Sequence, residues 1–109
     1  MRYTATLNSE YFVSGIVYVY INKNIVTITG SELTLKKAVT GTNVVVATHS
    51  IIPGATGQTP FFPIIDYTNH SVYRGRIEQG KVSIPYDGGA SINDRLYFTV
   101  TYIASSTAA

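Results

Sequence analysis

The chain has 109 residues, the size of one domain that can bury a core without a disulfide or a structural metal. It contains no cysteine, which excludes a disulfide framework, a thiolate nucleophile and a cysteine-based zinc site. Charged residues make up only 13% of the chain, and the net charge of +2 comes from basic and acidic residues scattered along it. This pattern lacks the basic stripe of a duplex binder, and sparse charge favours contact with another subunit or with neutral polar matter such as sugars.

Strand patterns begin near the N-terminus, and no segment shows the apolar spacing of a helix. Tyr11–Ile21 and Ile25–Thr29 flank a three-residue turn, NKN, and predict a β-hairpin. Glu32–Lys36 then alternates polar and apolar residues. The apolar run Asn43–His49 predicts a strand that is buried on both sides.

The second half predicts another hairpin and a closing strand. The stretch SVYRGRIEQGKVSIPY is expected to turn at Gln79-Gly80, a register that puts Tyr73 beside Tyr86 on one face. Because Gln is a poor first residue of a type I′ turn, a bulged turn that uses Gly80 is an equal alternative. Arg95–Ile103 alternates cleanly and predicts the last strand.

Two segments rich in Gly, Pro and Asp, Pro53–Pro60 and Asp87–Asp94, are expected to be loops. The oxygen ligands of Asp87–Asp94 could hold Ca²⁺. A simpler explanation is that its Asp and Asn side chains cap backbone groups of a turn, so we expect no metal site. Residues 1–109 are therefore predicted to form a single all-β domain. Its architecture would be a small antiparallel β-barrel or sandwich, with a Greek-key or jelly-roll-like arrangement.

Sequence signals of catalysis and membrane insertion are missing. The chain has no nucleophile elbow, no phosphate-cradling glycine loop and no His-Glu-x-x-His motif, so we expect no enzyme and no cofactor. No apolar run approaches the roughly 18–20 residues of a membrane span, and MRYTATLNSEYF lacks the apolar core of a signal peptide.

One stretch, PFFPIIDYTNHSVYRGR, concentrates aromatic, carboxylate, imidazole and guanidinium side chains. Carboxylates and guanidiniums take pairs of sugar hydroxyls, and an aromatic ring covers the apolar face of a sugar. The alternatives are an ordinary barrel edge, a site that stacks and pairs with single-stranded nucleic acid, and a glycan-cleaving enzyme. We expect saccharide rather than nucleic acid, and the candidate saccharide-binding residues are Asp66, Tyr67, His70, Tyr73, Arg74, Arg76, Tyr86 and Asp87.

The stretch from Gly30 to Tyr102 resembles the C-terminal head domain of the receptor-binding proteins of lactococcal tailed phages. The resemblance rests on the order of ATHSIIPG, PIIDY, VYRGRI and the closing YFTVTYI. It implies a trimeric β-barrel knob at the tail tip of the virion, which binds a saccharide, often bearing phosphate and glycerol, on a Gram-positive host. It also implies a preceding segment, missing here, that would trimerise and dock on the baseplate proteins.

The family pocket has a His two residues before an Asp, followed by a Trp and an Arg. Asp66 matches the Asp, and Tyr73 lies near the Trp position. Ile64 stands where the His would be, and the Arg position falls on Pro85-Tyr86. The resemblance therefore carries over only Asp66 and, by substitution, Tyr73.

A physical reason also favours a homotrimer. The runs GIVYVYI and NVVVA are apolar on both faces, and a one-layer barrel cannot bury both faces inside itself. Three weak sites on one rigid knob would bind a repetitive surface polymer with added avidity.

Overall fold

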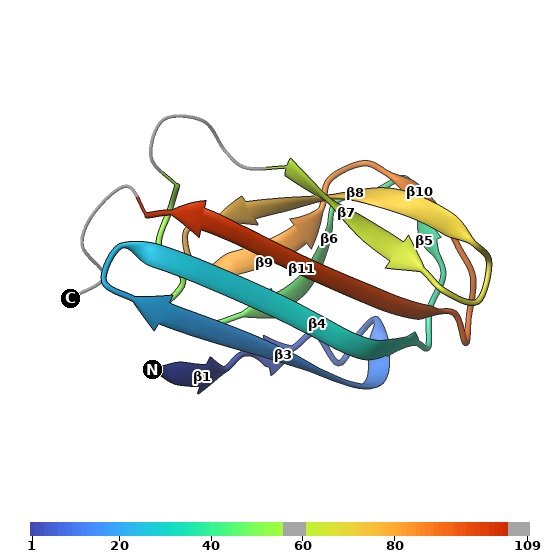
Figure 1. Cartoon of the computed structure of the whole chain (residues 1–109). Helices are drawn as coiled ribbons and strands as arrows, with labels where there is room; N and C mark the ends of the chain where they lie inside the picture. The colour runs from blue at the N-terminus through green and yellow to red at the C-terminus, as the bar shows by residue number, and fades with distance from the viewer. Residues whose placement is uncertain (56–60, 105–109) are drawn as a thin grey trace.

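The computed structural model describes residues 1–55 and 61–104, which form strands and no helix (Figure 1). The described residues thus include no helix that could cross a membrane. The predicted all-β class is confirmed. The strands are β1 (Arg2–Thr4), β2 (Thr6–Leu7), β3 (Phe12–Asn22), β4 (Ile25–Leu35), β5 (Val39–Thr40), β6 (Val44–Thr48), β7 (Phe61–Asp66), β8 (Ser71–Glu78), β9 (Lys81–Ile84), β10 (Gly88–Ala90) and β11 (Arg95–Ile103).

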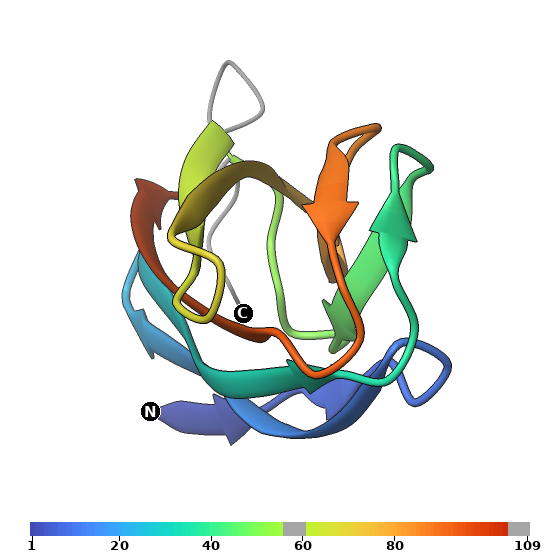
Figure 2. The same ribbon diagram turned by 90° about the vertical axis from the view of Figure 1, so that its right-hand side faces the viewer.

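Nine strands form one antiparallel sheet in the order β1-β3-β4-β11-β7-β8-β9-β6-β2, which curls into a nearly closed barrel (Figure 2). The short strands β5 and β10 pair separately. The two edges of the long sheet, β1 and β2, are consecutive in the chain. Between them, the N–H of Ala5 donates to the carbonyl of Val17 at 2.9 Å. The N-terminal segment therefore pairs first with β3 and then with β6, and closes the barrel.

The first hairpin is confirmed. Asn22 pairs with Ile25, which leaves Lys23 and Asn24 as the turn, and Lys23 adopts a left-handed φ of 60°. The predicted segments Ile25–Thr29 and Glu32–Lys36 form one continuous strand, β4, which pairs with β3 on one side and β11 on the other.

The core lies inside the barrel and follows the alternation of the strands. On β11 the inward side chains are all buried, as predicted: Leu96, Phe98, Val100 and Tyr102. The hydroxyl of Tyr102 donates to the carbonyl of Pro53 at 2.7 Å. Pro53 is buried, although it begins a segment rich in Gly and Pro for which an exposed loop was expected, and positions 56–60 of that segment lie outside the described residues.

β6 differs from its prediction. Val46 and Ala47 are consecutive and both buried, while Val45 is only half-buried. The pairing of β6 with β9 shifts between Val45 and Ala47, so a bulge adds one residue to β6 and turns two successive side chains inward. The expected burial on both sides is therefore wrong.

The second hairpin turns at Gln79-Gly80, as predicted. Gly80 has a φ of 84° whereas Gln79 does not have a positive φ, which excludes a type I′ turn. The expected pairing of Tyr73 with Tyr86 is wrong. Tyr73 is buried opposite Ile64 of β7, while Tyr86 follows the end of β9 with a φ of 52° and is exposed.

Candidate functional site

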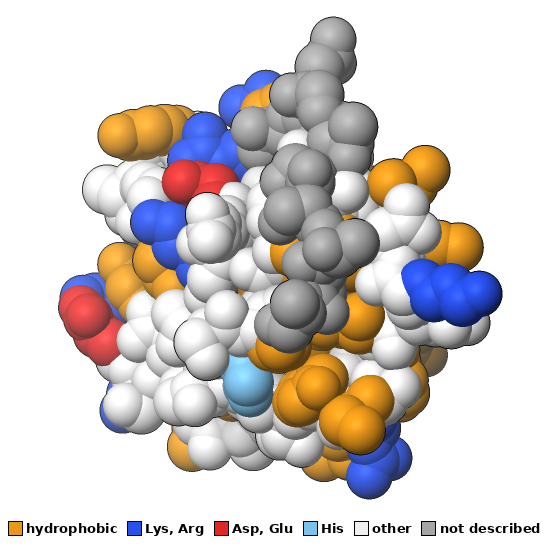
Figure 3. Space-filling view, turned by 90° about the vertical axis from the view of Figure 1, so that its left-hand side faces the viewer, with side chains coloured by type: hydrophobic (Ala, Val, Ile, Leu, Met, Phe, Trp, Pro, Cys, Tyr) orange, Lys and Arg blue, Asp and Glu red, His pale blue; other side chains and the backbone are white. Residues whose placement is uncertain are grey.

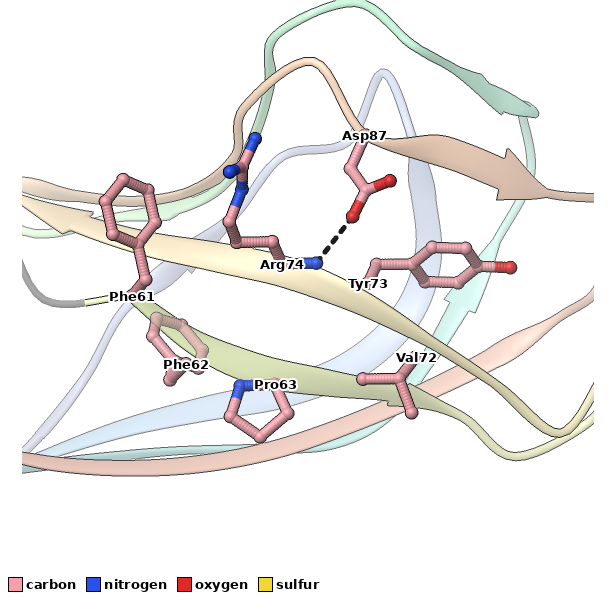
Figure 4. A pocket seen from close by; sticks show the side chains of 7 residues that line it. All are labelled: Phe61, Phe62, Pro63, Val72, Tyr73, Arg74 and Asp87. Atoms are coloured by element: carbon pink, nitrogen blue, oxygen red, sulfur yellow. Dashed lines mark hydrogen bonds between the residues drawn. The ribbon is translucent and has the colours of Figure 1, made fainter.

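A shallow depression of about 430 Å³ lies over β7 and β8, next to the loop that follows β9 (Figure 4). The two strands are antiparallel neighbours, so their outward side chains stand side by side. The depression is lined by Phe61, Phe62, Pro63, Val72, Tyr73, Arg74 and Asp87.

The exposed feature of this depression is an aromatic ring beside a cation. Phe61 is 55% exposed, and Cζ of Arg74 lies 5.2 Å from the centre of its ring. Within the described parts of the chain, the Arg74 guanidinium forms no salt bridge. A guanidinium has five N–H donors, and without a carboxylate partner among the described residues those of Arg74 are available to a ligand in the depression.

Asp87 fixes the loop against β8. Its Oδ2 accepts a hydrogen bond from the backbone N–H of Arg74 at 2.7 Å, and its Oδ1 accepts one from the N–H of Gly88 at 3.0 Å. Tyr86, the preceding residue, is 74% exposed. The carboxylate therefore anchors a loop that carries a solvent-exposed aromatic ring.

Asp66 and Tyr73 form a buried pair beneath this surface. Oδ2 of Asp66 accepts a hydrogen bond from the Tyr73 hydroxyl at 3.0 Å, and Oδ1 accepts one from the N–H of Asn69 at 3.0 Å. Burial raises the pKa of Asp66, and a hydrogen bond with the carboxyl of Asp94 raises it further. Burial likewise raises the pKa of Tyr73, as does Asp66. Because Asp66 has no exposed surface, its place suits holding the β7–β8 turn rather than touching a ligand.

Tyr67 and His70 lie in the four-residue turn between β7 and β8, and both are exposed. Their rings are 6.5 Å apart, and the Tyr67 ring lies 6.0 Å from that of Tyr97 on β11, edge to face. These two predicted residues therefore point to a neighbouring surface and do not line the depression.

Arg76 is engaged within the fold. Its Nη2 donates to Oε1 of Glu78 at 2.6 Å. Its Nε and the hydroxyl of Ser83, its cross-strand partner, are buried and find no hydrogen-bond partner among the residues described. The charge of Arg76 is thus largely neutralised, unlike that of Arg74.

Of the eight candidate residues, the structure brings Tyr73, Arg74 and Asp87 into one depression, with Tyr86 next to Asp87 in the chain. The sequence reasoning missed Phe61 and Val72, which are both well exposed. The alternation of Phe61–Asp66 was the available signal, since it places Phe61 on the face opposite the buried Phe62.

The loop Asp87–Asp94 contains β10, and both of its acids accept backbone hydrogen bonds. Oδ2 of Asp94 accepts from the N–H of Ser91 at 2.9 Å, as Asp87 does from Gly88. In the described ranges, no three His, Cys, Asp or Glu residues form a group that could hold a metal ion. Asp87 and Asp94 therefore cap backbone N–H groups, which is the role that the sequence predicted for them.

No protein-family model and no curated protein sequence matches the chain. Among solved structures, it is similar to the head domain of phage bIL170, described as a receptor-binding domain of a lactococcal phage. The two share 11% sequence identity with a TM-score of 0.71, over 95% of this chain and 97% of that chain. The head-domain fold that the sequence resemblance predicted is therefore confirmed.

Proposed function

We propose that the chain is the receptor-binding head of a phage tail, and that it attaches the virion to a saccharide on a Gram-positive host without cleaving it. The observation that carries the proposal is the exposed Phe61 ring beside the Arg74 guanidinium, in a depression on a barrel with the fold of a phage head domain. A planar guanidinium donates to neighbouring hydroxyls of a sugar, and the ring covers the apolar face of the same sugar.

The candidate residues take different roles in this proposal. Arg74, with Tyr86 and Asp87 on the adjoining loop, contacts the saccharide. Asp66 and Tyr73 position the β7–β8 turn from below through their 3.0 Å hydrogen bond. Three further residues border the contact surface: Tyr67, His70 and Arg76.

The proposed assembly is a homotrimer at the tail tip, joined to other tail proteins. The end of the barrel that carries the N-terminus and the β3–β4 turn has hydrophobic patches between separate charged groups (Figure 3). Its exposed apolar side chains include Met1, Tyr20, Ile25 and Ile103. Contact between copies would cover them, and three linked sites would raise the avidity for a repeating polymer.

The test is the binding of purified domain to cell-wall polysaccharides from Gram-positive strains, measured by calorimetry. We expect Arg74→Ala to lower the affinity about fivefold or more, as truncation of a central contact does. Arg2→Ala is the matched control, because Arg2 also stacks on an aromatic ring, 4.5 Å from the centre of Tyr18. Equal affinities of the two variants would contradict the assignment of the site.

Two parallel measurements address the alternatives. Binding to a single-stranded oligonucleotide that weakens steeply between low and high salt would favour the nucleic-acid function. Release of fragments from a polysaccharide that the domain binds would favour an enzyme.

A further inference from the structure

A second depression, of about 420 Å³, lies on the outward side of β4, β11 and β7. Its floor and walls include Thr29 and Thr99, which are direct cross-strand partners, and Ser31 on the same strand as Thr29. Tyr97 and Ile65 also line it, and they too are cross-strand partners. The depression thus presents the hydroxyl groups of Thr29, Ser31 and Thr99 beside the outward side chains of Tyr97 and Ile65.

The lining of this depression carries no charged side chain. The nearest acid that contacts it is Glu32, whose Oε1 accepts a hydrogen bond from the Tyr97 hydroxyl at 3.4 Å. Beyond Tyr97 the aromatic surface continues to Tyr67, which is 65% exposed, and then to His70. The hydroxyl groups and the ring face of this lining suit a neutral polyhydroxylated ligand, and the neighbouring Glu32 carboxylate can accept hydrogen bonds from its hydroxyls.

The two depressions flank a single strand. β7 lies between β11 and β8, and Ile65 pairs with Tyr97 on one side and with Val72 on the other. Tyr97 and Ile65 line the second depression, while Val72 lines the first. Direct partners point to the same face, so these three side chains form one outward row. Neighbouring strands are about 4.8 Å apart, so the row that joins the two depressions spans roughly 10 Å from Tyr97 to Val72.

We propose that one saccharide chain runs across β7 and occupies both depressions, so that the receptor is recognised as an oligosaccharide of several units. A neutral unit lies against Tyr97 and the threonine hydroxyls, and another unit lies beside Phe61 and Arg74. This inference rests on the proposed function and extends it to a second subsite, for which Tyr97 is the principal contact.

The test uses fragments of the polysaccharide that the domain binds, prepared by partial acid hydrolysis and separated by size from monosaccharide to hexasaccharide. For the wild-type domain we expect the affinity to rise about fivefold or more once a fragment is long enough to span both depressions. Tyr97→Ala should remove this gain for the longer fragments and leave the binding of the shortest fragments that contact Arg74 unchanged. Tyr97→Phe, which keeps the ring, should retain most of the gain.

Tyr11→Ala serves as the control, because Tyr11 is half-buried like Tyr97 but precedes β3 and lies outside both depressions. Thermal unfolding of each variant establishes that it is folded before binding is measured. Affinity that does not depend on fragment length, or equal binding by Tyr97→Ala and wild type at every length, would overturn the second subsite while leaving the proposed function intact. Failure of the wild-type domain to bind any polysaccharide would overturn both.

Discussion

Removing the hydroxyl of Tyr73 should destabilise the domain through the buried carboxyl of Asp66. Tyr73→Phe deletes one atom, the donor of the 3.0 Å hydrogen bond to Oδ2 of Asp66. Tyr73 is 5% exposed and Asp66 is fully buried, so water has little access to replace the donor. A hydrogen bond to a charged group contributes about 1.5–3 kcal/mol. We therefore expect the free energy of unfolding to fall by about 2 kcal/mol and the Tm by roughly 8–16 °C.

The loss of stability caused by Tyr73→Phe should also depend on pH. Burial and Asp94 raise the pKa of Asp66, whereas the Tyr73 hydroxyl lowers it. A raised carboxyl pKa means that the folded state binds the proton more tightly than the unfolded chain. Stability from Asp66 is then greatest below its ordinary pKa of 3.8 and falls as the pH rises through the raised value. Without the Tyr73 hydroxyl the pKa of Asp66 rises further. Tyr73→Phe should therefore lower the free energy of unfolding more at pH 8 than at pH 4.

Urea unfolding at both pH values, followed by circular dichroism at one protein concentration, measures the two effects. Tyr86→Phe is the control, since Tyr86 is 74% exposed and its substitution should change stability by no more than about 0.5 kcal/mol. The reasoning is refuted if Tyr73→Phe is as stable as Tyr86→Phe, or if its cost is the same at pH 4 and pH 8.

Four other outcomes are expected. Gly75→Ala should lower the free energy of unfolding by about 1–3 kcal/mol in urea, because its Cβ would lie 2.6 Å from Cζ of Phe62. Tyr102→Phe should lower the Tm, because the carbonyl of Pro53 loses a donor at 2.7 Å; an unchanged Tm would contradict this. Asp66→Asn removes the titrating group, so its stability should vary less between pH 4 and pH 8 than that of the wild type. Light scattering coupled to size exclusion should give the mass of three chains at micromolar concentration, and a monomer mass would reject the trimer.

Local periodicity was sufficient to predict the strands that alternate cleanly. Arg95–Ile103 follows directly from apolar residues at every second position, and the first hairpin follows from two runs of β-branched and aromatic residues on either side of the NKN turn. The bulge in β6 and the closing role of Arg2–Leu7 could not be predicted in this way. Both depend on which distant strands become neighbours, and a segment of two or three paired residues carries no periodic signal of its own.

The candidate site was only partly predictable for a related reason. Arg74 and Asp87 are 13 positions apart, and they meet because the chain turns back after β9. The burial of Asp66, in contrast, could have been read from the sequence. Phe62 and Ile64 precede it at alternate positions of β7, so an inward Phe62 requires an inward Asp66.

The N-terminal segment that closes the barrel is synthesised before both of its partner strands, and one of them comes much later than the other. β1 can pair with β3 early, but β2 must wait for β6, about 40 positions later in the chain. Until β2 and β6 pair, each presents a row of unpaired backbone groups to other chains. A chain that begins at Asn8 would leave the edges of β3 and β6 exposed permanently. We would expect such a chain to aggregate edge to edge, so the first seven residues protect the solubility of the fold as well as completing it.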